Sequence, residues 1–197
     1  MGKQRKKPSS GQQPVYYVLR DDQLRCLTSP VRHDMVDHLS AHGVMSIREL
    51  AASIGKKPAS IYHHLNQLIE VGLVQEAGSR LVNRRHEKLY TTPSRRMRLS
   101  RALADRANNK VMREIVDALC RQTARDFSHG LKVESARRDG AQQNLRFFRL
   151  VNRPAAKSLK ELNRKLDEIA EILWRDPDPA SPVVALTWIL TPTLSTE

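Results

Sequence analysis

The stretch SIRELAASIGKKPASIYHHLNQLIEVGLV, residues 46–74, carries the clearest local structural signals of this chain. Ser46 and Glu49 have the spacing of a capping box, in which each side chain binds the backbone N–H of the other residue, so a helix is predicted to begin here. Gly55 marks a tight turn, because glycine tolerates the left-handed conformation that follows many helices. Pro58 suits the first position of the next helix, where no N–H is needed. The stretch therefore predicts two helices joined by a tight turn.

The sequence on either side completes a small domain. Before the stretch, residues 21–27 are predicted to form a short helix, and Ser29-Pro30 opens a longer one that Gly43 ends. After Gly72 the apolar residues alternate, which indicates a hairpin of two strands with Asn83-Arg84-Arg85 at its basic tip. Residues 15–93 thus predict a helical domain followed by a hairpin.

The charge of the chain indicates a polyanionic partner. The net charge is +13, and residues 1–128 carry an excess of 11 positive charges, whereas residues 129–197 are almost balanced. A protein that neutralises phosphates gains free energy from the counterions released, so this surplus favours nucleic acid. The low aromatic content, 5%, argues against a platform on which RNA bases stack.

Other features limit where the protein acts. No run approaches the roughly 18 apolar residues that a membrane span needs. Cys26 and Cys120 are the only cysteines and lie far apart, which favours a reducing cytoplasm over a disulfide framework. Residues 1–14 are basic but precede no apolar run, so they predict a disordered arm rather than a secretory signal. Contact of this arm with DNA or lipid is the alternative.

Candidate DNA contacts follow from the helical period of residues 58–70. With about 100° of rotation per residue, one face is apolar and the opposite face is polar. Side chains that are placed to read base edges are Ser60, His63, Asn66 and Gln67. Candidates for phosphate contact before this helix, at its flank and in the hairpin are Lys56, Lys57, Tyr62, Arg80, Arg84, Arg85 and Lys88. His64 is predicted to pack instead, and Arg95–Arg101 line either DNA or plain surface.

The order helix, capped helix, turn, helix and basic hairpin is that of a winged helix-turn-helix. SPVRHDMVDHL (residues 29–39), residues 46–74 and KLYTT (residues 88–92) together resemble the arsenic-repressor (ArsR) type of this family. The resemblance implies a homodimeric, sequence-specific regulator of transcription, either a repressor or an activator, whose interface uses the helices that flank the motif.

Metal sensing and catalysis are not expected, and no cofactor is predicted. Members of that family hold metals through a Cys-x-Cys pair on the second motif helix or through Asp, His and Glu on the dimer helix, and this chain has neither pattern. His38 and His42, four residues apart, are a weak hint of a zinc site. No nucleophile elbow, phosphate-binding glycine loop or dinucleotide fingerprint is present.

The rest of the chain predicts an interface and a small extra element. Thr92-Pro93 opens a predicted helix to about Phe127, with more apolar surface than a small domain covers, so residues 94–128 are expected to be a dimerisation helix. In residues 129–197, a helix at 159–173 stands between strand-like runs at 145–151 and 183–190. The fold class is therefore α+β, mainly α, with a C-terminal β-α-β element that serves either effector binding or dimerisation.

Three functions remain open at this point. The first is a sequence-specific regulator, which the polar face of residues 58–70 favours. The second is a non-specific architectural DNA-binding protein, for which positive charge alone would suffice. The third is a winged helix used for protein contacts. A small-molecule effector is possible, since Trp174, Trp188, Phe147 and Phe148 could bind an apolar compound, but no residue pattern identifies one.

Overall fold

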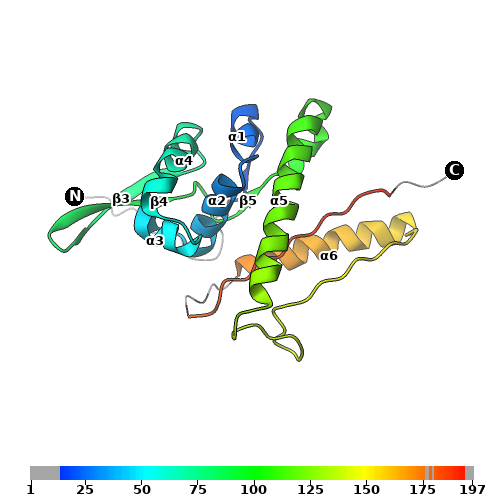
Figure 1. The fold of residues 1–197 in the computed structure, drawn as a ribbon. Coiled ribbons are helices and arrows are strands. Elements are labelled where there is room, and N and C mark those ends of the chain that lie inside the picture. Colours follow the sequence, from blue (N-terminus) through cyan, green and yellow to red (C-terminus); the bar gives the residue numbers. More distant parts are fainter. Residues whose placement is uncertain (1–13, 176–177, 179, 194–197) are drawn as a thin grey trace, which may run out of the picture.

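The computed structural model describes residues 14–175, 178 and 180–193 (Figure 1). The predicted arm therefore lies outside the described residues, except for Pro14. Its helices are α1 (Asp21–Cys26), α2 (Pro30–His42), α3 (Ile47–Ser53), α4 (Pro58–Glu70), α5 (Asn109–Gly130) and α6 (Ala156–Trp174). Its strands are β1 (Tyr16–Tyr17), β2 (Met45–Ser46), β3 (Gln75–Val82), β4 (Arg85–Thr91) and β5 (Met97–Arg98). No helix among the described residues is long and apolar enough to cross a bilayer.

The helices α1–α4 and the hairpin follow the local sequence signals. The predicted starts at Asp21, Pro30 and Pro58 and the capping box before α3 are all confirmed. Strands β3 and β4 form an antiparallel hairpin, and β2 adds to β4 to give a sheet of order β2-β4-β3. The short strand β2 thereby ties the start of α3 to the base of the hairpin.

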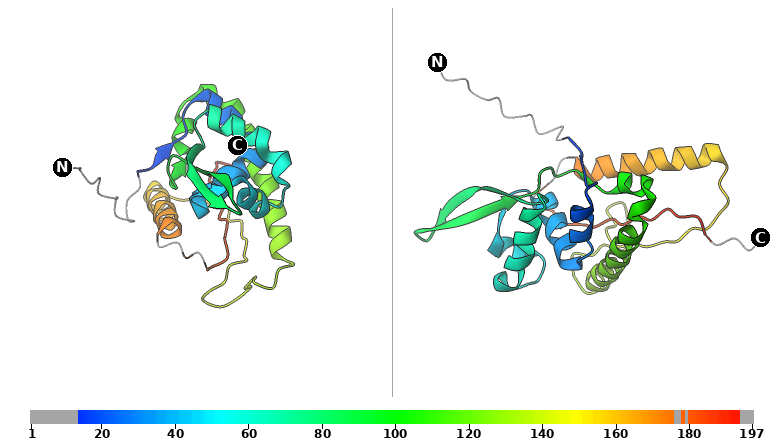
Figure 2. Two further views of the ribbon diagram at one scale, coloured as in Figure 1. Left: turned by 90° about the vertical axis from the view of Figure 1, so that its left-hand side faces the viewer. Right: turned by 90° about the horizontal axis from the view of Figure 1, so that it is seen from above.

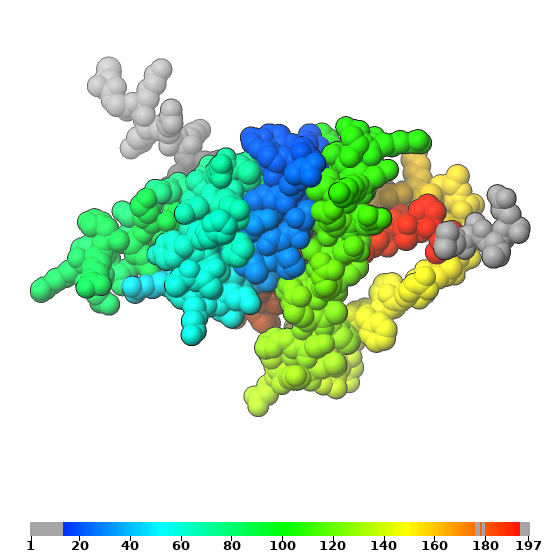
Figure 3. Space-filling view, turned by 45° about the horizontal axis from the view of Figure 1, so that its top comes forward, coloured from blue at the N-terminus to red at the C-terminus, as the bar shows by residue number. Residues whose placement is uncertain are grey.

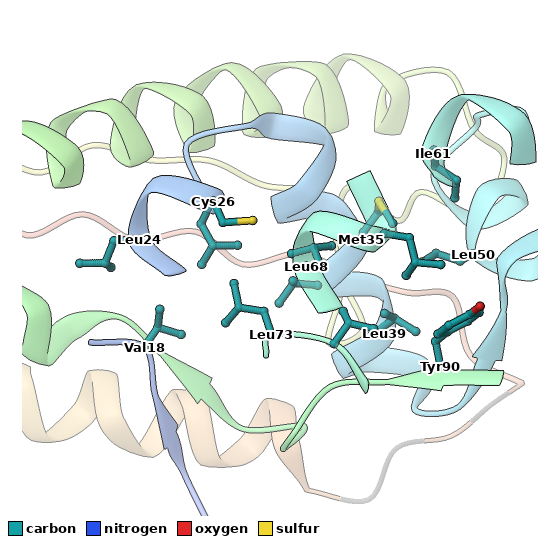
Figure 4. Packing of buried hydrophobic residues seen from close by; sticks show 14 of the residues in the cluster. Val18, Leu24, Cys26, Met35, Leu39, Leu50, Ile61, Leu68, Leu73 and Tyr90 are labelled. Atoms are coloured by element: carbon teal, nitrogen blue, oxygen red, sulfur yellow. The ribbon is translucent and has the colours of Figure 1, made fainter. Parts of the chain in front are cut away.

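One hydrophobic core joins these elements (Figure 4). Leu24, Met35, Leu39, Leu50 and Leu68 come from four different helices and are fully buried. Each such side chain contributes roughly 1.5–3 kcal/mol of burial free energy, so the first helices are held together mainly by this cluster. The helix α5 closes the core from one side with the buried residues Val111, Met112, Ile115 and Ala118.

The long helix predicted from Thr92 is wrong in its first part, because α5 begins only at Asn109. Residues 97–98 form β5, which pairs in parallel with β1, and two short 3-10 helices, Ser100–Ala104 and Arg106–Asn108, follow. The N–H groups of Tyr16 and Val18 donate to the carbonyls of Arg96 and Arg98, both at 2.9 Å. Backbone carbonyls that serve a distant strand in this way cannot also continue a helix.

The predicted β-α-β element is also wrong in its strands. The helix α6 is present, but residues 145–151 and 183–190 are extended segments and not strands. A strand requires a run of hydrogen bonds to a neighbouring strand. Among the described residues, the 145–151 segment makes one backbone hydrogen bond, from the N–H of Leu145 to the Arg137 carbonyl (3.2 Å), and the 183–190 segment makes none. These two segments and α6 lie at the end of the molecule opposite the hairpin, as Figure 2 shows in its right-hand view.

Candidate nucleic-acid interface

Local hydrogen bonds set the angle between α3 and α4. The N–H of Ser46 donates to the Glu49 carboxylate (2.8 Å), and the N–H of Glu49 donates to the Ser46 hydroxyl (3.3 Å), which completes the capping box. Gly55 has a φ of +64°, and the next N–H, of Lys56, donates to the Ala51 carbonyl at 2.8 Å. A side chain at position 55 would strain this turn, so the sequence fixes where α3 ends and α4 begins.

The helix α4 buries one face and exposes the other. Ile61, Leu65 and Leu68 are fully buried in the core. The opposite face carries the predicted base-reading residues Ser60, His63 and Asn66, all exposed, and Tyr62, whose side chain is 51% exposed. A row of exposed donors and acceptors on a helix of 13 residues has the dimensions that fit the major groove.

Gln67 differs from the other predicted readers. It is half-buried, and its amide oxygen accepts a hydrogen bond at 2.7 Å from the guanidinium of Arg32 on α2. Arg32 is itself held by the carbonyl of Cys26 at 2.5 Å. The Gln67 side chain is thus oriented by a charged donor, with its NH2 group left for another acceptor. Sequence reasoning missed Arg32, since nothing in the sequence places α2 beside α4.

Cations flank α4 at its start. Lys56 and Lys57 are exposed in the turn before Pro58 and have no ion-pair partner among the described residues. The N-terminus of a helix also presents unpaired backbone N–H groups, which favour an anion.

His64 lies near the middle of α4. Its pKa is lowered by burial and, to a smaller extent, by the nearby charges of Arg32 and His63. His64 is half-buried, as its predicted packing role requires.

The hairpin projects beyond the helices at the same end of the molecule as α4 (Figure 3). Its turn is formed by Asn83 (φ +49°) and Arg84 (φ +63°), the backbone pattern of a two-residue turn in tight hairpins. Arg84 and Arg85 are exposed at this tip and make no ion pair with the described residues. The tip therefore presents two guanidinium groups to solvent.

Arg80 and Lys88, also predicted to contact phosphate, are engaged within the protein. The Arg80 guanidinium lies 2.7 Å from the Glu49 carboxylate and 2.9 Å from that of Glu87, so it ties β3 to the start of α3. Lys88 is 2.6 Å from Glu76 across the hairpin. Both side chains remain partly exposed, and a phosphate would have to compete with these carboxylates.

The arginines that follow the hairpin make contacts within the protein. Arg95 donates to the carbonyls of Ser40 and Ala41 at the end of α2. Arg96 pairs with Glu171 and Arg98 with Asp167 on α6, the latter at 3.1 Å. Arg101 lies 3.6 Å from the ring centre of Tyr17. The basic run at Arg95–Arg101 is therefore used largely for internal contacts.

The histidines form no metal site among the described residues. The rings of His38 and His42 stack with their centres 5.9 Å apart, and no group of three potential ligands surrounds them or any other point in the described ranges. Burial, followed by the nearby His42, lowers the pKa of His38.

Arg48 on α3 is a second cation that the sequence analysis did not identify. Its side chain is 75% exposed and lies 4.0 Å from Glu87.

Comparison with known proteins supports this placement. Residues 27–76, from the end of α1 to the start of β3, match a family model described as a helix-turn-helix domain. A search of curated proteins found no match to the chain. The matched segment contains α3, the Gly55 turn and α4 complete. The chain therefore carries a helix-turn-helix domain, which is a DNA-binding domain of transcriptional regulators.

Proposed function

We propose that this protein is a sequence-specific regulator of transcription that binds double-stranded DNA as a homodimer through a winged helix-turn-helix of the ArsR type. In this proposal α4 lies in the major groove, the β3–β4 hairpin is the wing, and the protein acts in the cytoplasm without a metal cofactor. The observation that carries the proposal is the exposed polar face of α4 beside cations that have no ion-pair partner in the described part of the chain.

The roles of the side chains follow from their exposure and their chemistry. His63, Asn66 and Gln67 would read base edges, because imidazole and amide groups pair with purine edges in the major groove. Ser60 would contribute less, since its hydroxyl already donates to the Lys57 carbonyl at 2.7 Å. Lys56, Lys57 and Tyr62 would hold the backbone beside α4, and Arg84 and Arg85 would contact a flanking groove.

A non-specific architectural protein is the alternative that the net charge permits. It would need the lysines and arginines but no exposed amides on α4. Replacing Asn66 by Ala discriminates between the two functions: we expect a loss of roughly 1–3 kcal/mol on the preferred duplex and little change on a scrambled duplex. Glu70→Ala, at the exposed end of α4, is the matched control.

The measurement is a fluorescence titration of both duplexes at several salt concentrations. The preferred duplex would first be obtained by selecting bound sequences from a random pool. Equal losses on preferred and scrambled DNA would show that α4 does not read sequence, and the architectural function would then be the better account.

A further inference from the structure

The exposed apolar surface of this protein is concentrated in its C-terminal part. Of the 21 large apolar side chains that are exposed in the described chain, 15 lie between Phe147 and Leu190. They include Phe147 (82% exposed), Leu150 (83%) and Ile172 (62%). A monomer in water rarely exposes so many neighbouring apolar side chains, and such a patch marks an interaction surface.

The helix α5, by contrast, has no large apolar side chain among those exposed. Its apolar residues Val111, Met112 and Ile115 are buried against the core of the same chain. Its outer face carries charged residues such as Arg113 and Asp117. The sequence suggested α5 as the dimer helix because of these apolar residues. The structure uses them within one chain, so the surface that still needs a partner lies elsewhere.

Two extended segments supply most of that surface. Residues 146–152 and 183–190 have no backbone hydrogen bond to any other described segment. In residues 183–190 the apolar side chains Val183, Val184, Leu186, Trp188, Ile189 and Leu190 are each 42–53% exposed and point to both sides of the extended chain. A run that is apolar on both faces is typical of a strand inside a sheet that is covered on both sides.

Contacts with α5 hold both segments in place. The ring of Phe147 meets that of Phe127 edge-on, with 5.6 Å between centres. The hydroxyls of Thr187 and Thr123 are 3.0 Å apart. The segments are thus fixed beside α5 with open backbone edges, and open edges of this kind pair readily with another chain.

The helix α6 carries an apolar face that is also uncovered. Leu159, Leu162, Ile169 and Leu173 are 37–46% exposed, while Ala170 is the only residue of α6 that is buried. Opposite-charge contacts of Glu171 with Arg96 and of Asp167 with Arg98 fix this helix near its C-terminal end. Its apolar side chains are therefore available to a partner.

We propose that residues 146–152, the helix α6 and residues 183–190 form the interface with a second copy of this chain, in which the extended segments of the two copies pair as strands of one intersubunit sheet and the apolar faces of α6 cover it. This inference rests on the proposed homodimer and assigns its surface. A second copy is the fitting occupant because one chain presents both the open strands and an apolar helix to cover them, which is the self-complementarity that a two-fold interface requires.

Size and position agree with such an interface. Fifteen large side chains about half exposed amount to on the order of 1,000 Å² per copy, above the roughly 800 Å² per partner of a stable complex. The helix α6 and the C-terminal end of the described chain lie on the side away from the hairpin (Figure 3). Two copies joined there would keep both helix-turn-helix motifs accessible to DNA.

The first test is the mass of the full-length chain by light scattering at micromolar concentration. We expect twice the chain mass of 22.5 kDa for the unmodified protein and the single mass for the double variant Leu186→Glu with Ile189→Glu. The matched control is Leu81→Glu, which changes an equally apolar side chain, 66% exposed, in the hairpin and should leave the dimer intact.

The second test needs no substitution and so does not depend on whether a variant folds. Amides of residues 183–190 have no acceptor within the described chain, so they should exchange with solvent rapidly in dilute protein and slowly in concentrated protein. Fast exchange in a confirmed dimer would place the interface elsewhere and overturn the inference, as would a monomeric unmodified chain.

Failure of the proposed function gives a different result. A monomeric double variant should still prefer a single half-site over scrambled DNA, while its affinity for a duplex with two half-sites decreases by roughly 10²-fold. Loss of the half-site preference in a folded protein would instead count against specific recognition by α4.

Discussion

Arginine side chains that look equivalent in the sequence have separate tasks in the structure. Arg84 and Arg85 stand at the hairpin tip without an ion pair among the described residues, whereas Arg80 is bound to two carboxylates. Arg32 orients Gln67 through a single charged hydrogen bond. The surroundings of each guanidinium, rather than the density of positive charge, determine which arginines are available to phosphate.

Burial also raises the free-energy cost of ionising one carboxylate, that of Asp34. Asp34 on α2 is half-buried facing α5, and burial, followed by the nearby carboxylates Asp126 and Asp37, raises its pKa from 3.8 to about 6. The folded protein therefore binds the Asp34 proton more tightly than the unfolded chain does. The stability associated with that proton is complete below about pH 4 and is lost as the pH increases through 6.

Asp34→Asn should consequently stabilise the protein at pH 7.5 by about 1–2 kcal/mol, because the amide cannot ionise. The advantage should shrink below pH 6 and disappear near pH 4. Thermal unfolding of both proteins across this range measures it. Asp117→Asn, on the exposed face of α5, should change stability by no more than about 0.5 kcal/mol. A pH-independent difference for Asp34→Asn would contradict the assignment.

At the level of secondary-structure elements, the β3–β4 hairpin carries a positive charge at a turn position where the backbone is strained. Arg84 has a left-handed backbone (φ +63°), where glycine is at no disadvantage and most other residues are strained by about 1 kcal/mol. The position therefore carries a long cation at a site that suits glycine better. A contact of the Arg84 guanidinium with a partner such as DNA would explain why arginine and not glycine occupies this position.

Replacing Arg84 by Gly should keep or slightly raise the melting temperature and still weaken DNA binding. The loss should be similar on preferred and scrambled duplexes, and the slope of log affinity against log salt should decrease by about 1 for one lost phosphate contact. Arg84→Lys, which keeps the charge and the strain, is the control and should retain the slope. An unchanged slope for Arg84→Gly would mean that the tip does not contact phosphate.

Considering the molecule as a whole, α6 is attached to the helix-turn-helix domain mainly through Trp174 and the nearby Glu171. The guanidinium groups of Arg96 and Arg98 each lie 5.0 Å from the ring centre of Trp174, and the nearby Glu171 pairs with both arginines. The hydrophobic core contains no residue of α6. The domain should therefore remain folded when α6 is released.

Trp174→Ala should loosen α6 without unfolding the helix-turn-helix. Cation–π contacts contribute about 0.5–2 kcal/mol, so amides of α6 should exchange several times faster while those of α3 and α4 keep their rates. Lys160→Ala, an exposed change on the same helix, is the control. If exchange accelerated equally in α4, the two parts would unfold as one unit.

The helix-turn-helix could be predicted from local sequence signals alone. The capping box at Ser46, the turn at Gly55 and the apolar period of α4 act over at most a few residues, so their outcome can be worked out locally. The hairpin and its basic tip follow from alternation and from a two-residue turn in the same way. The exposure of Ser60, His63 and Asn66 is a consequence of that period.

The other features of the fold and of the candidate interface depend on contacts between distant parts of the chain. Whether residues 97–98 form a strand depends on Tyr16 and Tyr17, which are distant in the sequence. The partners of Arg32, Arg80, Arg96 and Arg98 also come from separate elements. The segments at 145–151 and 183–190 have the composition of strands, but a strand exists only where another strand edge donates and accepts a run of hydrogen bonds, and no described part of this chain pairs with them as a strand.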